Sequence, residues 1–162
     1  MNLFKTTYQS PVGKLQIACS DEALCALTFL NENDAAELTE SNHLTQETCR
    51  QLDEYFSGSR KLFQIPILQP GTPFQSKVWT LLQDIPYGKT VSYMDLSKRY
   101  GDVKAIRAVA SANGKNNLAI IVPCHRVIGS NQSLTGYAGG LWRKNWLLAH
   151  EAKFSHGVQE LF

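Results

Sequence analysis

The sequence predicts an α/β protein of two domains, a small N-terminal α/β domain over residues 1–69 and a mainly helical C-terminal domain over residues 70–162. In the first domain, short apolar segments alternate with turn residues, which is typical of antiparallel strands. In the second, two capping-box patterns precede apolar residues at helical spacing. Gln69-Pro70-Gly71 is the expected linker, because proline and glycine interrupt regular structure.

Three antiparallel strands and one helix are expected in the N-terminal domain. The predicted strands cover residues 3–8, 14–19 and 23–30. Apolar and semi-apolar side chains recur at helical spacing over residues 44–56, and Gly58 follows where glycine commonly ends a helix. Acidic residues 34–40 also predict the start of a short helix, and residues 62–65 predict a short strand that Pro66 ends.

Four helices are expected in the C-terminal domain. Thr72 and Gln75 form a capping box that begins a helix running to about Asp84. Its predicted buried face consists of Phe74, Val78, Leu81, Leu82 and Ile85. A second capping-box pattern begins at Ser92, and Gly101 closes the helix that follows. The remaining helices are expected over residues 103–112 and 141–153. The middle two helices have the outline of a helix-turn-helix, which an ordinary helical hairpin shares.

Charge is distributed unevenly along the chain, although the net charge is only +2. Residues 1–72 contain five Lys/Arg and nine Asp/Glu, whereas residues 73–162 contain eleven and five. The basic C-terminal half indicates a polyanionic partner, and nucleic acid is the favoured one. An ordinary solvated surface can have the same composition. No apolar run reaches the length of a membrane span, and the N-terminus lacks the apolar core of a signal peptide. We therefore expect a cytoplasmic protein with no membrane partner.

The four cysteines lack the spacing of a disulfide framework or a structural metal site. Cys19, Cys25 and Cys49 lie in the N-terminal domain and Cys124 in the C-terminal domain, with no Cys-x-x-Cys pair. Reduced thiols are therefore expected. His43 completes no tetrahedral pattern with the N-terminal cysteines, so no metal site is predicted.

The segment around Cys124 is the strongest candidate for chemistry. An apolar run over residues 120–122 leads into Pro123, and Cys124, His125 and Arg126 follow directly. Proline favours an extended backbone in the residue before it and ends a helix or strand. Cys124, His125 and Arg126 are therefore expected directly after the end of a regular element. A desolvated cysteine beside a histidine can lose its proton to that histidine and act as a nucleophile. An inert buried thiol is the alternative, but buried apolar sites rarely hold a histidine and an arginine as well.

The pentapeptide Pro-Cys-His-Arg-Val at residues 123–127 resembles the active-site signature of the O6-alkylguanine-DNA alkyltransferases, and the resemblance extends over about residues 72–153. It implies a ribonuclease H-like N-terminal domain and a winged helix-turn-helix in the C-terminal domain. It also implies direct-reversal DNA repair, in which the alkyl group of O6-alkylguanine, and of O4-alkylthymine, passes irreversibly to Cys124 once per molecule. The implied protein is a monomer that acts on double-stranded DNA containing alkylated guanine and requires no cofactor.

The resemblance assigns catalytic roles to Cys124, His125, Glu151, Asn116 and Tyr93. His125 takes the proton of Cys124 through a water molecule, and Glu151 holds the imidazole in the right tautomer. Asn116, eight residues before Cys124, ties the preceding loop to the active-site turn. Tyr93 crowds the phosphate beside the target, helps to rotate the nucleotide outward and supplies a proton to the leaving guanine.

Further residues are implied at the DNA and in the base pocket. The helix over residues 103–112 is rich in Ala, which suits close approach to a minor groove, and its Arg107 fills the space of the flipped base. The implied DNA contacts are Tyr93, Met94, Arg107 and Ser130, and the implied base-pocket residues are Val127, Tyr137 and Ala138. Alanine at positions 119 and 138, where relatives carry proline and serine, predicts a pocket that accepts bulkier alkyl groups. His150 and His156 lack such partners and are expected at the surface.

Two other functions fit parts of the sequence. A cysteine hydrolase would use Cys124, His125 and Glu151 for acyl transfer, but no oxyanion donor set is recognisable and the basic half would have no role. A helix-turn-helix module that binds lesions without chemistry is the other alternative, although relatives of that type lack the reactive cysteine.

Overall fold

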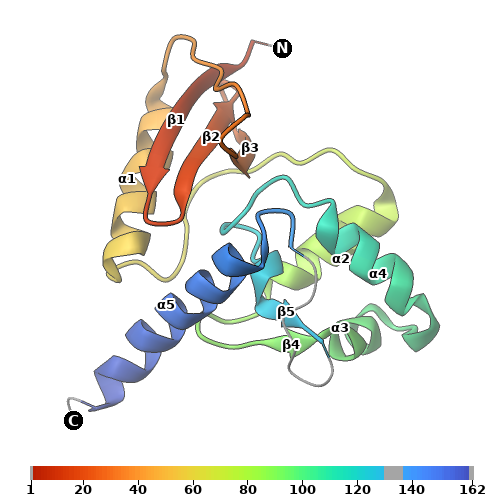
Figure 1. Ribbon diagram of the computed structural model, residues 1–162. Helices are drawn as coiled ribbons and strands as arrows, with labels where there is room; N and C mark the ends of the chain where they lie inside the picture. The colour runs from red at the N-terminus through yellow and green to blue at the C-terminus, as the bar shows by residue number, and fades with distance from the viewer. Residues whose placement is uncertain (1, 130–136, 161–162) are drawn as a thin grey trace. The chain divides into compact units, whose positions relative to one another are not determined.

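The structure is a computed structural model that describes residues 2–129 and 137–160 (Figure 1). The chain divides into two compact units, Met1–Gln69 and Pro70–Phe162. Among the described residues there is no helix with the length and apolar character of a membrane span.

An antiparallel sheet and one helix form the N-terminal unit, as the sequence predicts. The strand order is β1-β2-β3, with β1 at Phe4–Ser10, β2 at Gly13–Cys19 and β3 at Leu24–Phe29. Helix α1 (His43–Ser57) packs against this sheet (Figure 1). Gly58 takes the left-handed conformation at φ 88° and ends α1 by donating its N–H to the carbonyls of Glu54 and Tyr55. Buried side chains of this unit include Leu15, Ile17, Leu27, Leu52 and Tyr55.

The predicted short helix within residues 34–40 is wrong, because this segment has no regular secondary structure and a buried glutamine binds its backbone. The side-chain amide of Gln16 in β2 donates to the carbonyl of Glu37 at 2.8 Å and accepts the N–H of Glu37 at 2.7 Å. These two bonds satisfy backbone groups that a helix would otherwise pair.

The predicted strand over residues 62–65 is also wrong, and for the same reason. The buried side chain of Gln51 accepts the N–H of Gln64 at 2.9 Å and donates to its carbonyl at 3.1 Å. Strand-like pairing begins only after Pro66, where Ile67 forms a parallel bridge with Leu24.

Helices and one short pair of parallel strands form the C-terminal unit, which confirms the expected α/β class. The elements are α2 (Pro73–Gln83), β4 (Val91–Ser92), α3 (Tyr93–Tyr100), the 3-10 turn η1 (Val103–Ala105), α4 (Ile106–Gly114), the 3-10 turn η2 (Cys124–Arg126), β5 (Val127–Ile128) and α5 (Leu141–Glu160). Helices α2, α3 and α4 pack against one another. Strands β4 and β5 lie side by side, with Val91 beside Val127, so the segment after Cys124 is joined to the start of α3 (Figure 1).

The helix starts in this unit follow the local sequence signals. Thr72 caps α2 and Ser92 caps α3, each through a reciprocal pair of hydrogen bonds with the residue three positions later. Gly101 ends α3 at φ 108°. Trp79, which is absent from the predicted buried face, is buried in α2 and donates its indole N–H to the carbonyl of Ala112 in α4 at 2.9 Å.

Three details of the helices differ from expectation. Phe74 and Leu81 are only half-buried, whereas Trp79 is buried and binds Ala112 in α4. Helix α4 follows a 3-10 turn and ends at Gly114, and α5 continues to Glu160.

Candidate active site

Two tight turns position Cys124 at the start of η2. Ile120 has φ 72°, and the N–H of the following residue donates to the carbonyl of the preceding residue at 2.8 Å, which closes a γ-turn. A second γ-turn centres on Pro123 (φ −81°, ψ 64°), where the N–H of Cys124 donates to the carbonyl of Val122 at 2.8 Å. A positive φ at a β-branched residue is strained, so tertiary packing has to impose it.

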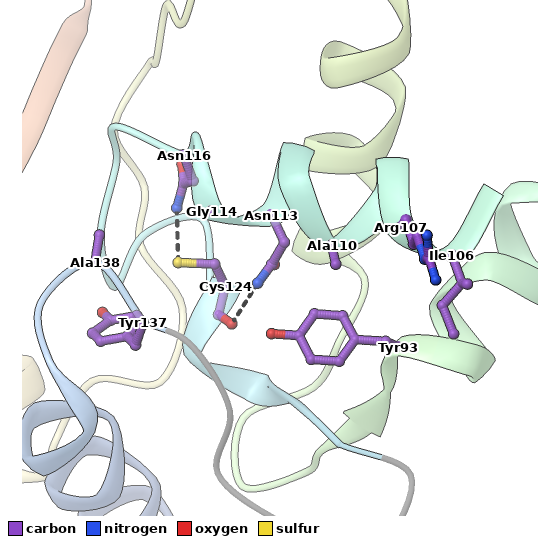
Figure 2. A pocket seen from close by; sticks show the side chains of 10 residues that line it. All are labelled: Tyr93, Ile106, Arg107, Ala110, Asn113, Gly114, Asn116, Cys124, Tyr137 and Ala138. Carbon is purple, nitrogen blue, oxygen red and sulfur yellow. Dashed lines mark hydrogen bonds between the residues drawn. The ribbon is translucent and has the colours of Figure 1, made fainter.

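The side chain of Asn116 joins this turn to the end of α4. Its Nδ2 lies 3.3 Å from Sγ of Cys124 (Figure 2). The same nitrogen lies 2.8 Å from the carbonyl oxygen of Val122 and 3.3 Å from that of Leu118. Its Oδ1 accepts the N–H of Leu118 at 3.0 Å. One amide thus fixes both the loop backbone and the sulfur, and a hydrogen bond donated to sulfur favours the thiolate.

His125, Glu151 and Arg126 form a buried cluster next to Cys124 in the chain. Nε2 of His125 lies 2.7 Å from Oε2 of Glu151, and both side chains are fully buried. Arg126 binds the same carboxylate twice, with Nε 2.8 Å from Oε1 and Nη2 3.1 Å from Oε2. Burial would raise the pKa of Glu151, but His125 and Arg126 outweigh burial and hold this pKa well below its usual range.

The ionised carboxylate of Glu151 sets the tautomer of His125. Because an ionised carboxylate only accepts hydrogen bonds, Nε2 of His125 carries the ring proton and donates it. Nδ1 is then the basic nitrogen, and it has no hydrogen-bond partner among the described residues.

Burial works against charge on both Cys124 and His125. It raises the pKa of the Cys124 thiol, and the hydrogen bond from Asn116 and the positive charge of Lys144 oppose that rise. It lowers the pKa of His125, and the contact with Glu151 opposes that fall. The resting site therefore holds a neutral thiol beside a neutral imidazole, and nearby groups have to offset the charge of a thiolate.

Cys124 lines a cavity of about 600 Å³ in the C-terminal unit (Figure 2). The lining residues are Tyr93, Ile106, Arg107, Ala110, Asn113, Gly114, Asn116, Cys124, Tyr137 and Ala138. In Figure 2 the sulfur faces Asn116, and the ring of Tyr93 lies between Cys124 and Arg107. A volume of this size suits one small ligand or one base.

The cavity brings together six predicted site residues from separate segments of the chain, namely Tyr93, Arg107, Asn116, Cys124, Tyr137 and Ala138. His125 and Glu151 do not line it and lie in the core, in contact with each other. Val127 is fully buried in β5 and Met94 is half-buried in α3, and neither lines the cavity. Ser130 lies outside the described residues.

Three further residues, which were not predicted from the sequence, belong to this site. Asn113 donates from Nδ2 to the carbonyl of Cys124 at 3.4 Å, Arg126 binds Glu151, and Lys144 is fully buried in α5. Helical periodicity is the signal that identifies Lys144, because it lies seven residues, or two turns, before Glu151 on one face of α5.

His150 is buried, so the expectation that it lies at the surface is wrong. Its ring stacks on Trp146 with centroids 4.9 Å apart and planes 14° apart, and its centroid lies 4.9 Å from that of Phe154. The three residues are spaced by four along α5, so the helix aligns them in one row. The side chain of His156 lies outside the described residues.

The three N-terminal thiols do not line the cavity that contains Cys124. None of the cysteines is bridged, and in the described part of the chain no group of three or more His, Cys, Asp or Glu residues could hold a metal ion. Burial raises the pKa of Cys19 to about 11, so that thiol is protonated at neutral pH.

Comparison with known protein families matches both units of the chain. Residues 73–153 match the family model described as 6-O-methylguanine DNA methyltransferase, DNA binding domain. Residues 3–69 match the model described as 6-O-methylguanine DNA methyltransferase, ribonuclease-like domain.

Similar proteins are found in bacteria and archaea. The chain is 47% identical over 147 residues to the constitutive methylated-DNA–protein-cysteine methyltransferase of Bacillus subtilis, which covers 86% of this chain and 88% of that protein. It is 42% identical over 153 residues to the methylated-DNA–protein-cysteine methyltransferase of Methanosarcina acetivorans, with 92% and 98% covered.

Two crystal structures from Mycobacterium tuberculosis share the fold. O6-methylguanine methyltransferase superposes with a TM-score of 0.86 at 39% identity, covering 94% of each chain. OGT in complex with DNA superposes with a TM-score of 0.84 at 41% identity, covering 91% of this chain and 92% of that one.

Proposed function

Because this chain belongs to the O6-methylguanine DNA methyltransferase family, we propose that it repairs O6-methylguanine in DNA by transferring the methyl group to Cys124. One observation carries the assignment to this residue. The sulfur of Cys124 lies in the wall of a base-sized cavity and accepts a hydrogen bond from Asn116. The other three cysteines lie in the N-terminal unit and do not line that cavity.

The exposed face of α4 supports binding of double-stranded DNA. Its exposed residues are Arg107, Ala108, Ser111 and Gly114, and Lys115 follows directly. Small side chains let the helix backbone approach the floor of a groove closely, while Arg107 and Lys115 supply positive charge. The minor groove carries little sequence information, which suits a protein that has to find damage in any sequence.

The damaged nucleotide has to rotate out of the duplex to reach the sulfur, because a stacked base cannot enter a cavity in the protein. Tyr93 and Met94 form the first turn of α3, and we place them against the phosphate beside the target. Arg107, at the cavity and exposed on α4, takes the space that the base leaves. We place Ser130, in the segment after β5, at the DNA as well.

The chemistry is a single displacement on the methyl carbon. The proton of Cys124 passes to Nδ1 of His125 through one bridging water, and Glu151 stabilises the resulting imidazolium. A sulfur–carbon bond forms as the carbon–O6 bond breaks, and the electron pair of the broken bond passes into the guanine ring. Tyr93 donates a proton to the ring nitrogen, and the proton held by His125 returns through solvent to the Tyr93 phenolate, so that both side chains end neutral. The products are guanine and S-methylcysteine, and because a thioether is not hydrolysed, each molecule acts once without a cofactor.

The walls of the cavity supply the contacts that select the base. We place the backbone amide of Ala138 at O6 and the ring of Tyr137 beside the base. The backbone carbonyls of Cys124 and Val127 accept from the exocyclic amine. The same displacement extends to O4-alkylthymine, whose alkyl group also sits on an exocyclic oxygen.

A titration against excess duplex DNA with one O6-methylguanine tests the proposal, with C124S as the control. The wild type should convert one lesion per chain and then stop, while C124S should bind the duplex and convert none. Conversion beyond one lesion per chain would indicate turnover, as in a hydrolase. Binding by the wild type without conversion would indicate a lesion-binding module, and either result would overturn the proposal.

A further inference from the structure

A short turn, and neither a helix nor a strand, carries two of the residues that line the cavity. Tyr137 and Ala138 both lie in this turn (Figure 2). The N–H of Gly140 donates to the carbonyl of Tyr137 at 2.9 Å and closes the turn, and α5 begins at the next residue. A turn is held less rigidly than a helix or strand, so side-chain contacts decide how it is oriented against the cavity.

Arg143, in the first helical turn of α5, binds back to this segment. Its Nη1 donates to the carbonyl oxygen of Gly139 at 3.1 Å, and both residues are buried. A buried carbonyl needs a hydrogen-bond partner, and a charged donor makes a stronger bond than a neutral one. The backbone N–H of Arg143 also donates to the carbonyl of Gly140 at 3.2 Å. Arg143 therefore binds both of the residues that directly follow Ala138.

The indole ring of Trp142 packs on the guanidinium of Arg143. The guanidinium carbon lies 4.8 Å from the centroid of that ring, within the range of a cation–π contact. The same ring lies against Gly140, where an added Cβ would be 3.4 Å from Cδ1 of Trp142. The two side chains thus fix the segment from Gly139 to Gly140 against the start of α5.

The orientation of the turn decides where the N–H of Ala138 points. Under the proposed function, this N–H donates to O6 of the lesion, on which negative charge develops as the carbon–O6 bond breaks. The strength of a hydrogen bond to such an atom depends steeply on distance and angle. A turn displaced by a fraction of an ångström therefore stabilises the transition state less well.

We propose that Arg143 is a positioning residue for methyl transfer, which fixes the turn from Tyr137 to Gly140 so that the N–H of Ala138 meets O6 of the flipped base. Arg143 is not among the residues that line the cavity, so it acts through the turn. The inference deepens the proposed function and rests on it for the contact with O6. The effect of Arg143 on the turn, in contrast, can be measured without DNA.

The test compares single-turnover methyl transfer by wild type and R143M from two lesions in duplex DNA, O6-methylguanine and S6-methyl-6-thioguanine. Sulfur is a weak hydrogen-bond acceptor, so the thio lesion gains little from the N–H of Ala138. R143M should slow transfer from O6-methylguanine about tenfold and transfer from the thio lesion about threefold or less. K153M is the matched control, because it removes the cation above Phe154 at an exposed position of α5, and it should leave both rates unchanged.

Hydrogen exchange of the free protein measures the turn itself. The amide of Gly140 should exchange faster in R143M than in the wild type, and R143K, which keeps a charged donor, should recover part of the protection and of the rate. An equal defect on the two lesions, or unchanged exchange at Gly140, would overturn the inference, because Arg143 would then not act through the turn.

Trp142 supplies a second variant should R143M fail to fold, because its side chain is 57% exposed. W142A removes the ring that packs on Arg143 and should show smaller changes in the same directions, so unchanged rates and unchanged exchange in W142A would also overturn the inference. Faster exchange at Gly140 in R143M, together with a wild type that takes no methyl from either lesion, would overturn the proposed function and leave the effect of Arg143 on the turn standing.

Discussion

The side-chain amide of Asn116 lies 3.3 Å from the sulfur of Cys124 and 2.8 Å from the carbonyl oxygen of Val122. The group that steadies the nucleophile therefore also holds the backbone turn that presents it. Since that turn contains a strained residue, Ile120 at φ 72°, the hydrogen bonds of Asn116 help to keep a conformation that the local sequence disfavours.

Asn116→Ala should slow methyl transfer and destabilise the fold together. The variant loses a donor that favours the thiolate, and it leaves the N–H of Leu118 without the partner that Asn116 supplies. We expect single-turnover repair to fall about 10- to 100-fold and the free energy of unfolding to fall by about 1–3 kcal/mol. Asn117→Ala, at an exposed neighbour, is the control. Repair within twofold of wild type would show that the amide does not support the thiolate.

Glu151→Gln should be strongly destabilising at neutral pH. The substitution leaves the buried guanidinium of Arg126 without its carboxylate partner, which typically costs about 3–5 kcal/mol. It also removes the group that orients His125, so methyl transfer should fall as well. Urea unfolding at pH 7 measures the first effect, with Glu32→Gln at an exposed position as the control.

The contribution of Glu151 to the free energy of unfolding should decrease as pH falls. Its pKa is lowered in the folded state, so the stabilisation is fully present above the unfolded value near ~4.3 and is lost progressively as pH falls below it. The stability difference between wild type and Glu151→Gln should therefore shrink between pH 5 and pH 3. A difference that stays constant across that range would argue against an ionised, paired carboxylate.

Arg107→Ala should impair repair of paired lesions without affecting the fold. Arg107 is exposed on α4 and lines the cavity, so its removal should leave the melting temperature unchanged. We expect repair in a fully paired duplex to slow by about tenfold or more, and the defect to shrink for a lesion in a mismatch, where flipping costs less. An equal defect on both substrates would place Arg107 in general DNA binding instead.

Ala138→Ser should narrow the range of alkyl groups accepted. Ala138 lines the cavity, whereas Ala119 is buried and does not, so the expected pocket width depends on position 138. The added hydroxyl should slow transfer from O6-benzylguanine by a few-fold, about 1 kcal/mol, relative to O6-methylguanine. The measurement is the ratio of single-turnover rates on O6-benzylguanine and O6-methylguanine in the wild type and in Ala138→Ser. An unchanged ratio would contradict the prediction, and so would a wild type that does not react with benzyl lesions.

Local signals explain which parts of the fold could be predicted from the sequence. The capping boxes at Thr72 and Ser92 and the glycines at 58 and 101 act within one helical turn, so each can be recognised without tertiary information. The two elements that were predicted wrongly depend instead on Gln16 and Gln51, which bind backbone groups 21 and 13 positions away. A glutamine gives no sequence signal that it will replace a helix or a strand.

The residues of the candidate site likewise fall into those that a local sequence signal identifies and those that depend on tertiary packing. Cys124 and His125 are adjacent in a specific motif, and Glu151 followed from the resemblance that this motif carries. Helical periodicity puts Lys144 on the same face of α5 as Glu151, but the full burial of its side chain depends on packing between α5 and the active-site turn. The positive φ of Ile120 runs against the preference of a β-branched residue, so only the folded structure reveals it.

Mass spectrometry of the protein after reaction with excess duplex DNA containing O6-methylguanine tests the central claim most directly. The intact chain should gain one methyl group in place of the thiol hydrogen and no more, and peptide mapping should place that methyl on Cys124. Repaired DNA together with an unmodified Cys124 would contradict the account, because the methyl group would then have left by a route that does not use this sulfur.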